Sequence, residues 1–542
     1  MNKKNKIFLT IIILISFLIR FYKSWDYPSL LWDEAALGYN TYSILQTGRD
    51  EYGQVLPIIF KSFGDYKPGL YVYLCLPFVK IFGLNQLSTR LPSIILGSLL
   101  PLFIYFLIKE INPKSHKIAL LAALVTAFNP YNIHFSRGAW ETNILTFELV
   151  TASFLFYRYI NRQKTKYLFF SAIIFGLSLF TYQAGKMISL FLIIVLYLLN
   201  FKQIKIKQLF FNFVIPLAIF SIPILWGLVF TNNGNRLKVV SLFSYPRNES
   251  EIQTIISETN KLDYQIFYNP INFFSRNFLS RYFNHFSPRF LTFEGDWQNP
   301  RHSPPYIGVI LYPSLIFLVF GIFFAFSKKN NKINLFFILW LLLAPIPASL
   351  TKDSVQSVRA MSFSVPLIYF ISLGIYSFFK KYNYLLLKLS VVLLYLLSFI
   401  YYGDLYLNHM VKKSPIDFIY GYQQAINYVI KNQDKFDRIY MTDYYGQPYI
   451  YYLFYSQYPP IKYQQQAVLE DATLDTGHIK TIDNIHFETA QFNFIQDHPG
   501  TLGIFSQEEI YRQGIDQRPE FSKFIPLSPI GNISTFYAYE NP

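Results

Sequence analysis

The sequence predicts an α-helical polytopic membrane protein with about eleven spans, a re-entrant or interfacial helix, and a small α/β extracytoplasmic C-terminal domain. Its 542 residues are 52% hydrophobic and 20% aromatic but only 15% charged, unlike a water-soluble domain. Nearly uncharged stretches such as 209–230 and 306–326 approach the roughly 20 residues that a bilayer crossing requires. Short Lys and Arg clusters separate these stretches. The net charge of +16 therefore indicates membrane topology, and we expect no nucleic-acid partner.

These basic clusters also set the expected orientation. Cytoplasmic loops carry an excess of Lys and Arg, so a multi-pass protein of the cell membrane is expected, with a cytoplasmic N-terminus and an extracytoplasmic C-terminal domain. The clusters lie at the N-terminus and at 109–117, 158–166, 202–207, 328–332 and 380–381. The expected spans are 7–22, 91–109, 117–133, 142–160, 167–182, 188–201, 209–230, 306–326, 333–350, 360–379 and 385–403.

Two apolar segments near the N-terminus could be read either as membrane spans or as something else. The first apolar segment follows three lysines as a signal peptide would, but no small-residue cleavage pattern comes after it, so we expect it to remain as the first span. The apolar segment 68–83 is short, and a full crossing there would move the basic loop 109–117 to the outside. We therefore expect 68–83 to be re-entrant or to lie in the outer interface, supported by protein.

The map predicts two domains. The membrane domain covers 1–403 and has long outer loops at 23–67 and 231–305. The tail, 404–542, is richer in polar residues, and a helical pattern followed by a short strand-like block predicts a small α/β fold. Cys75 is the single cysteine, so the chain has no intrachain disulfide.

The first outer loop carries an acidic pair, Asp33 and Glu34, soon after the first span. One of these carboxylates could be a general base for an acceptor hydroxyl. Alternatively, both begin a solvated helix, whose positive end favours acids. The loop ends at Tyr66 and Lys67, just before the short apolar helix. Lys67 could bind a lipid phosphate, with Tyr66 as a candidate substrate contact, or it could be an ordinary interfacial lysine.

Further charged residues lie at other expected outer positions. Arg137 and Glu141 are four residues apart, so on one helix they would share a face and form an ion pair, although charges at a span boundary more often face a functional cavity. Arg301 and His302 are candidate substrate-binding residues, and Arg359 is a candidate phosphate ligand because guanidinium matches phosphate geometry.

The segment 284–305 contains two His, two Arg and an Asp, but no metal-ligand spacing. We predict no cofactor and assign no metal ligands, while a divalent metal stays compatible with this composition.

Together these residues resemble the family 39 glycosyltransferases. The resemblance is carried by Asp33-Glu34, Lys67-Pro68, Arg90-Leu91-Pro92-Ser93 and the Ser136-Arg137 turn followed by an acid, and it covers roughly residues 1–400. This family is similar to protein O-mannosyltransferases and lipid A aminoarabinose transferases, and it belongs to the C-type membrane glycosyltransferase superfamily. The stretch 301–305 and the tail look like those of a bacterial subgroup.

The resemblance implies an inverting sugar transfer from a polyprenyl-phosphate donor, dolichyl or undecaprenyl, with Asp33 as base, Glu34 beside it and Lys67 at the donor phosphate. Relatives often have Asp where this chain has Glu141, which we include among the catalytic candidates, with Arg137 and Arg359 as phosphate ligands. The expected partners are the lipid-linked sugar, the lipid bilayer and an acceptor.

We therefore expect transfer to a hydroxyl or amine of a protein, lipid or cell-envelope glycan on the outer face. The alternative is a multi-spanning transporter or flippase of lipid-linked glycans, whose charges should lie near the membrane midplane rather than at the outer interface. A polymerase or ligase that uses a diphosphate-linked oligosaccharide also stays open. No nucleotide-binding motif is present in the sequence.

Overall fold

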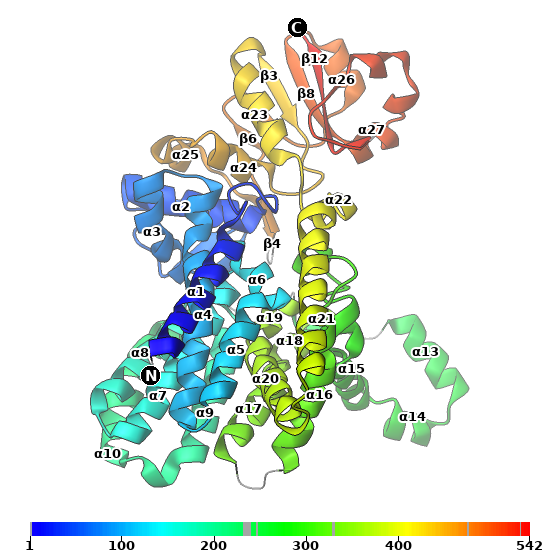
Figure 1. The fold of residues 1–542 in the computed structure, drawn as a ribbon. Helices are drawn as coiled ribbons and strands as arrows, with labels where there is room; N and C mark the ends of the chain where they lie inside the picture. The colour runs from blue at the N-terminus through cyan, green and yellow to red at the C-terminus, as the bar shows by residue number, and fades with distance from the viewer. Residues whose placement is uncertain (1–2, 231–239, 245–247, 328–330, 474–475, 532) are drawn as a thin grey trace. The chain divides into compact units, whose positions relative to one another are not determined.

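The computed structural model describes residues 3–230, 240–244, 248–327, 331–473, 476–531 and 533–542. Parts of the outer loop 231–305 and of the basic cluster 328–332 therefore lie outside the described residues. The described chain is mostly helical, and Figure 1 labels its elements. It forms two compact units, one made of Met1–Arg20, Ile95–Ser136 and Trp140–Tyr406, the other of Phe21–Ile94, Arg137–Ala139 and Leu407–Pro542.

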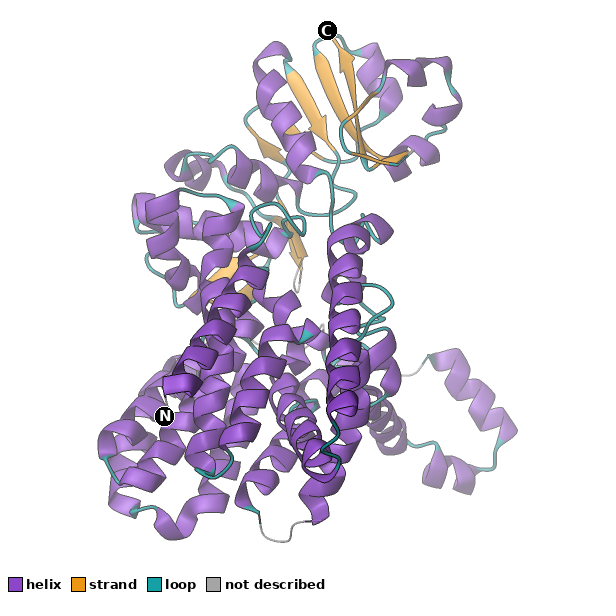
Figure 2. Cartoon of the chain, in the orientation of Figure 1, coloured by secondary structure: helices purple, strands orange, loops and turns teal. Residues whose placement is uncertain are grey.

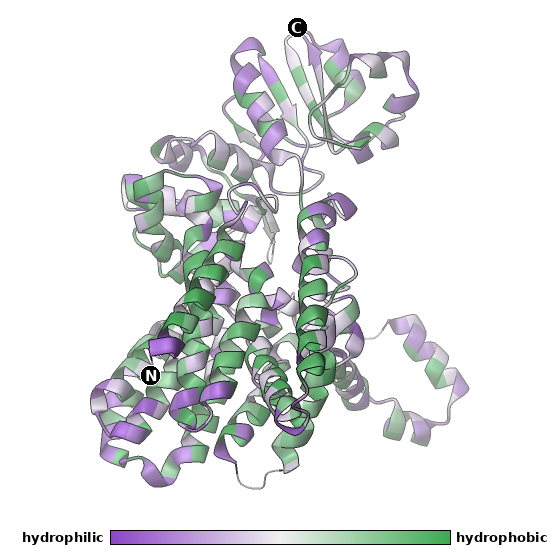
Figure 3. Ribbon diagram, viewed as in Figure 1, coloured by the Kyte–Doolittle hydropathy of each residue, from purple (hydrophilic) through white to green (hydrophobic). Residues whose placement is uncertain are grey.

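The first unit is a helix bundle, and Figure 3 shows that hydrophobic residues run along its helices, for example α21. Two of its helices cross the boundary between the units, since α1 ends and α4 begins in the second unit. The helices are α1 (Lys3–Phe21), α4 (Gln86–Ile111), α5 (His116–Phe128), α6 (Pro130–Ser136), α7 (Glu141–Arg162), α8 (Thr165–Ser178), α9 (Gly185–Asn200), α10 (Ile206–Leu209), α11 (Ile215–Phe230), α13 (Glu249–Glu258), α14 (Lys261–Phe267), α15 (Pro270–Asn284), α16 (Tyr312–Ser327), α17 (Lys332–Leu343), α18 (Ile346–Ser349), α19 (Ser357–Ala360), α20 (Ser364–Lys381) and α21 (Leu385–Asp404).

Within the described residues, 6 helices are long and apolar enough to cross a membrane, or up to 7 if the bent pair α5 and α6 is one span. Three shorter apolar helices accompany them, at Leu70–Phe82, Thr165–Ser178 and Tyr312–Ser327. The polytopic class is confirmed, while the count of about eleven spans stays a prediction. Helices α1 and α7 lie at expected spans but carry charged residues near their ends, which lowers their apolar character.

The expected span 117–133 is broken at Asn129, where α5 and α6 meet at an angle of 54°. Pro130 has no amide hydrogen, so the last carbonyls of α5 lose helical partners. Arg20 of α1 replaces them, because its guanidinium donates to the carbonyl oxygens of Thr126 at 3.3 Å and Ala127 at 3.2 Å. This buried arginine therefore stabilises a break inside the bundle.

Helices α16 and α20 cross at two glycines, Gly321 and Gly374. A Cβ atom on Gly321 would lie 1.8 Å from the Phe370 carbonyl oxygen, and one on Gly374 would lie 1.9 Å from that of Phe317. Only glycine permits such an approach of two backbones, which is how membrane helices pack without a hydrophobic driving force.

The N-terminal part of the second unit places the first outer loop beside the short apolar helix. Helix α2 (Trp32–Thr47) packs against α3 (Leu70–Phe82), and strands β1 (Ile59–Ser62) and β2 (Asp65–Pro68) form a hairpin between them in sequence. Phe63 and Gly64 make the turn with φ of 53° and 90°, the left-handed conformation that two-residue hairpin loops favour. The interfacial or re-entrant placement of 68–83 stays a prediction.

The tail of the second unit contains a six-stranded sheet in the order β6-β7-β3-β8-β12-β9, which confirms a β-containing C-terminal domain (Figure 2). Strands β7, β3 and β8 are parallel, and all six residues of β8 are buried. The helices are α22 (Met410–Lys413), α23 (Tyr422–Asn432), α24 (Pro448–Tyr455), α25 (Pro460–Gln466), α26 (Phe492–Asp497) and α27 (Gln507–Arg512); the strands are β3 (Arg438–Met441), β4 (Glu470–Thr473), β5 (Thr476–His478), β6 (Thr481–Ile482), β7 (Ile485–Phe487), β8 (Thr501–Ser506), β9 (Ile525–Pro526), β10 (Pro529–Ile530), β11 (Ile533–Ser534) and β12 (Phe536–Asn541).

Candidate active site

The acidic pair begins α2, and its two members have different surroundings. Glu34 is buried and accepts from the backbone amide of Leu31 at 3.1 Å, which caps the helix. Its other contacts come from distant segments. Arg90, in the first turns of α4, donates from Nε to Oε1 at 2.8 Å and from Nη2 to Oε2 at 2.6 Å. The amide of Ala139 donates to Oε1 at 2.7 Å. Glu34 is therefore surrounded by donors of its own chain.

Arg90 is fully buried and completes this network. Its Nη1 donates to the carbonyl oxygen of Ser24 at 3.0 Å, and its Nη2 to that of Ser29 at 3.3 Å. The Arg90 and Glu34 pair thus joins the first outer loop, the start of α4 and the turn 137–139. In the sequence Arg90 stands out only as part of the Arg90-Leu91-Pro92-Ser93 motif, although an arginine at the start of a long apolar helix itself indicates a buried partner.

Asp33 faces a different environment. Its carboxylate forms an ion pair with the ammonium of Lys67 on β2, and the Asp33 side chain stays 41% exposed, against 20% for Lys67. The Lys67 ammonium also lies 5.1 Å from the centre of the Phe63 ring in the hairpin turn. Tyr66 neighbours Lys67 and pairs with Lys61 across the hairpin. The structure therefore brings together an accessible acid and a cation that the sequence separates by the whole loop.

Arg137 belongs to the same unit but not to a helix. It lies in the turn after α6, is buried, and its Nη2 is 3.5 Å from the carbonyl oxygen of Tyr27. Glu141 is the first residue of α7. The idea that Arg137 and Glu141 share one helix face is wrong, because the turn 137–140 interrupts the helix between them.

The remaining predicted site residues lie in the first unit. Arg359, in α19, donates from Nη1 to the Thr351 hydroxyl at 3.0 Å and to the Asp353 carboxylate at 3.3 Å. Arg301 and His302 form a short turn before α16, and Arg301 and Arg359 both act electrostatically on His302. Arg301, His302 and Arg359 therefore lie near one another.

Asp296, which is not among the residues predicted for the site, connects Arg301 and His302 to the segment of Arg359. Its carboxylate accepts from His302 Nδ1 at 2.9 Å and from the amide of Ser357, at the start of α19, at 2.8 Å. Burial acts to raise the pKa of Asp296, but the hydrogen bond and charge of His302 outweigh it and hold that pKa below its usual range. Asp296 thereby ties the loop of Arg301 and His302 to the helix of Arg359.

The composition of 284–305 left a divalent metal open. Among the residues that the structure describes, no group of three or more His, Cys, Asp or Glu side chains could hold a metal ion. His285 instead has two backbone partners, since its Nδ1 lies 2.8 Å from the Arg281 carbonyl oxygen and its Nε2 accepts from the Gln356 amide at 3.2 Å. Burial lowers the pKa of His285 to about 4, so this ring is neutral and structural.

A second buried acid, Glu51, lies next to α2. Glu51 is fully buried, exchanges hydrogen bonds with the side chain of Asn40 in α2, and keeps one carboxylate oxygen without a partner among the described residues. Burial raises its pKa from the ordinary 4.5 to about 8, against the opposing effect of the Asn40 hydrogen bond. Glu51 is thus protonated at neutral pH, which the sequence did not indicate.

The sequence and the fold of this chain are similar to those of known proteins. Residues 66–226 match the family model described as dolichyl-phosphate-mannose-protein mannosyltransferase. The fold is similar to that of ArnT from Cupriavidus metallidurans bound to undecaprenyl phosphate, with a TM-score of 0.55 and 10% identity over 99% of this chain and 97% of that one. The same protein in the apo state gives a TM-score of 0.55 and 10% identity over 98% of each chain.

The Archaeoglobus fulgidus oligosaccharyltransferase in the apo form matches with a TM-score of 0.44 and 15% identity over 83% of this chain, which spans only 64% of that protein. No curated protein matches the sequence.

The matched region, residues 66–226, includes Lys67 and Arg137, and the likeness to ArnT is one of fold. The family match agrees with the resemblance to the family 39 glycosyltransferases that the sequence carries.

Proposed function

We propose that this glycosyltransferase moves a sugar from a polyprenyl-phosphate donor to a hydroxyl or amine of a protein, lipid or cell-envelope glycan, on the outer face of the membrane and with inversion. The undecaprenyl phosphate bound to ArnT and the dolichyl-phosphate named in the matching family support this class of donor. A lipid-linked donor also fits a chain whose acidic pair lies at the membrane surface in the predicted topology.

The observation that carries the proposal is the contrast between Asp33 and Glu34. Glu34 is enclosed by Arg90 and two backbone amides, whereas Asp33 is accessible and forms an ion pair with Lys67. A general base needs a carboxylate that an acceptor can reach, and a leaving phosphate needs a nearby cation. Asp33 and Lys67 offer both, while Glu34 holds the start of α2 in place.

The proposed reaction follows from these roles. Asp33 removes the proton of the acceptor hydroxyl, and the acceptor oxygen attacks the anomeric carbon from the face opposite the phosphate. The bond between that carbon and the phosphate oxygen breaks, and polyprenyl phosphate leaves with both bonding electrons. Lys67 stabilises the departing charge, with Arg137 and Arg359 as further phosphate ligands and Glu141 as an additional acid. Tyr66, Arg301 and His302 are proposed to contact the substrates.

The test is a transfer assay. Membranes containing the protein are incubated with a panel of radiolabelled polyprenyl-phosphate sugars, and the labelled product is identified. We expect one donor to lose its label to an acceptor in the wild type and none in Asp33→Asn. Movement of intact lipid-linked sugar across vesicles, without any transfer, would favour the flippase alternative instead.

A further inference from the structure

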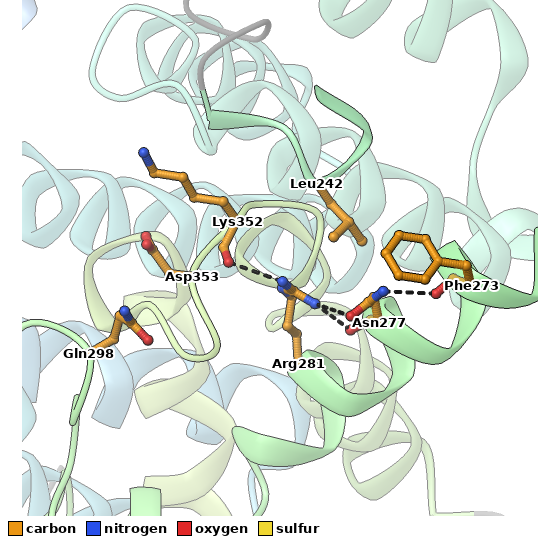
Figure 4. A pocket seen from close by; sticks show the side chains of 7 residues that line it. All are labelled: Leu242, Phe273, Asn277, Arg281, Gln298, Lys352 and Asp353. Atoms are coloured by element: carbon orange, nitrogen blue, oxygen red, sulfur yellow. Dashed lines mark hydrogen bonds between the residues drawn. The ribbon is translucent and has the colours of Figure 1, made fainter. Parts of the chain in front are cut away.

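The first unit contains a cavity of about 410 Å³ that none of the proposed catalytic residues lines. Its walls come from α15, from the loop that contains Gln298, and from the segment after α18 (Figure 4). Phe273, Asn277 and Arg281 lie four residues apart on α15 and so share one helix face. The opposite wall is held by backbone hydrogen bonds, from the Lys352 amide to Val240 and from the Leu242 amide to Leu350, both at 2.9 Å.

The polar groups of this cavity are fixed in place. The Arg281 guanidinium donates to the carbonyl and side-chain oxygens of Asn277 at 3.0 and 3.1 Å and to the Lys352 carbonyl at 3.1 Å, as Figure 4 shows. Gln298 accepts from the Ser354 hydroxyl at 2.9 Å through its oxygen, and its amide nitrogen makes no hydrogen bond within the described residues. The cavity therefore presents preorganised donors.

The charge balance of the cavity is positive. Among the described lining residues Asp353 is the one acid, and its Oδ2 already accepts from Arg359 at 3.3 Å and from Gln356 at 3.0 Å. Among the described residues Arg281 donates hydrogen bonds to neutral oxygens, its Nε is buried without an acceptor, and the Asp353 carboxylate acts on it through charge alone. Lys352 adds a second positive charge. An arginine whose guanidinium is held in place without a hydrogen bond to a carboxylate of the described residues is suited to bind an anion.

The volume of the cavity and the residues that line it indicate which class of ligand it could bind. A volume of about 410 Å³ is that of a small-molecule site. Of the described lining residues only Leu242 and Phe273 are apolar, so these walls do not suit a polyprenyl chain. Amide, carboxylate and guanidinium groups beside one aromatic ring instead match the hydroxyls and the apolar face of a sugar ring. We propose that this cavity binds an anionic sugar of the acceptor, one that carries a phosphate or carboxylate group.

The proposal that the anionic sugar belongs to the acceptor rests on the proposed function. Binding of the sugar to the cavity does not, so it is measured separately from sugar transfer. The full-length protein is purified in detergent, and the dissociation constants of glucose 6-phosphate, glucuronate, glucose and inorganic phosphate are measured by calorimetry. We expect both anionic sugars to bind at least about tenfold more tightly than either glucose or phosphate alone. Arg281→Gln should weaken their binding by about ten- to a hundredfold.

Arg276→Gln is the matched control, because Arg276 is an exposed arginine of the same helix that does not line the cavity. It should bind the anionic sugars as the wild type does. Lys352→Gln removes the other charge from an exposed position and carries the test if Arg281→Gln does not fold.

Three results would overturn the assignment. Equal binding of glucose would exclude recognition of the anion, and equal binding of phosphate alone would reduce the cavity to a simple anion site. An equal loss of undecaprenyl phosphate binding in Arg281→Gln would assign the cavity to the donor. Failure of every donor in the transfer assay, with anionic sugars still bound, would overturn the proposed function but not this cavity.

Discussion

Asp33 and Glu34 are neighbours in sequence, yet their contacts predict opposite consequences of mutation. Asn in place of Asp33 keeps the shape of the side chain but cannot accept a proton. We expect Asp33→Asn to lower kcat by about 10²- to 10⁴-fold while the donor still binds. The measurement is transfer by purified variants together with donor binding. Asp26→Asn, an exposed acid of the same loop, is the control and should stay active.

Glu34→Gln should act on stability instead. It leaves the fully buried Arg90 without its counter-charge, and breaking a buried ion pair costs about 3–5 kcal/mol. We expect a clear loss of Tm for Glu34→Gln and an unchanged Tm for Asp33→Asn. Near-normal turnover in Asp33→Asn with an inactive Glu34→Gln that keeps its Tm would move the base to Glu34.

Lys67 and Arg359 are proposed phosphate ligands, so their loss should affect the donor. Replacing either with Met removes a hydrogen bond to a charged group, worth about 1.5–3 kcal/mol, and should lower kcat/KM for the donor about ten- to a hundredfold. Lys61→Met, on the paired strand of the same hairpin, is the control. Unchanged donor kinetics in both variants would remove phosphate binding from their roles.

Among the helices and strands, the sequence predicted the elements that are determined by a local residue pattern. The helix that starts at the acidic pair and the short helix after Lys67 both form. The hairpin 59–68 was not predicted, and the shared helix of Arg137 and Glu141 was wrong, because spacing alone does not reveal the turn at 137–140. The contacts of Arg90 and Asp296 join segments far apart in the chain, which no local pattern encodes.

The burial of Glu51 beside α2 predicts how the stability of the protein depends on pH. The folded state keeps the Glu51 proton up to about pH 8, whereas the unfolded chain releases it near 4.5. Between these values the folded state binds more protons, so stability falls as pH rises, by at most about 1.4 kcal/mol per pH unit. Glu51→Gln cannot ionise and keeps an oxygen for Asn40. We therefore expect its Tm to exceed that of the wild type at pH 8.

The advantage of Glu51→Gln should shrink as the pH is lowered toward 5. Thermal unfolding in detergent across this range is the measurement, and Glu488→Gln, at an exposed site of the tail, is the control. A difference in Tm that does not change with pH would exclude Glu51 as the titrating group.

At the scale of the whole molecule, the orientation is the prediction on which the mechanism depends. Cys75 is buried, so single cysteines can be introduced at exposed positions on its Cys75→Ser background. In intact cells an impermeant thiol reagent should label Asp497→Cys in the tail but not Lys164→Cys in the basic loop. The reverse pattern would invert the topology, and the outer-face mechanism would fail with it.

Within the second unit, the tail is bonded to the first outer loop across almost the full chain. The Tyr451 hydroxyl donates to the Leu30 carbonyl at 3.0 Å, and the Tyr39 hydroxyl to that of Tyr458 at 3.0 Å, across 421 and 419 residues of sequence. The ribosome makes the segment around Asp33 early, but these partners are among the last residues to emerge. The proposed catalytic segment therefore gains these two hydrogen bonds only late in synthesis, and we expect a chain truncated before residue 451 to insert into the membrane but to lack transfer activity.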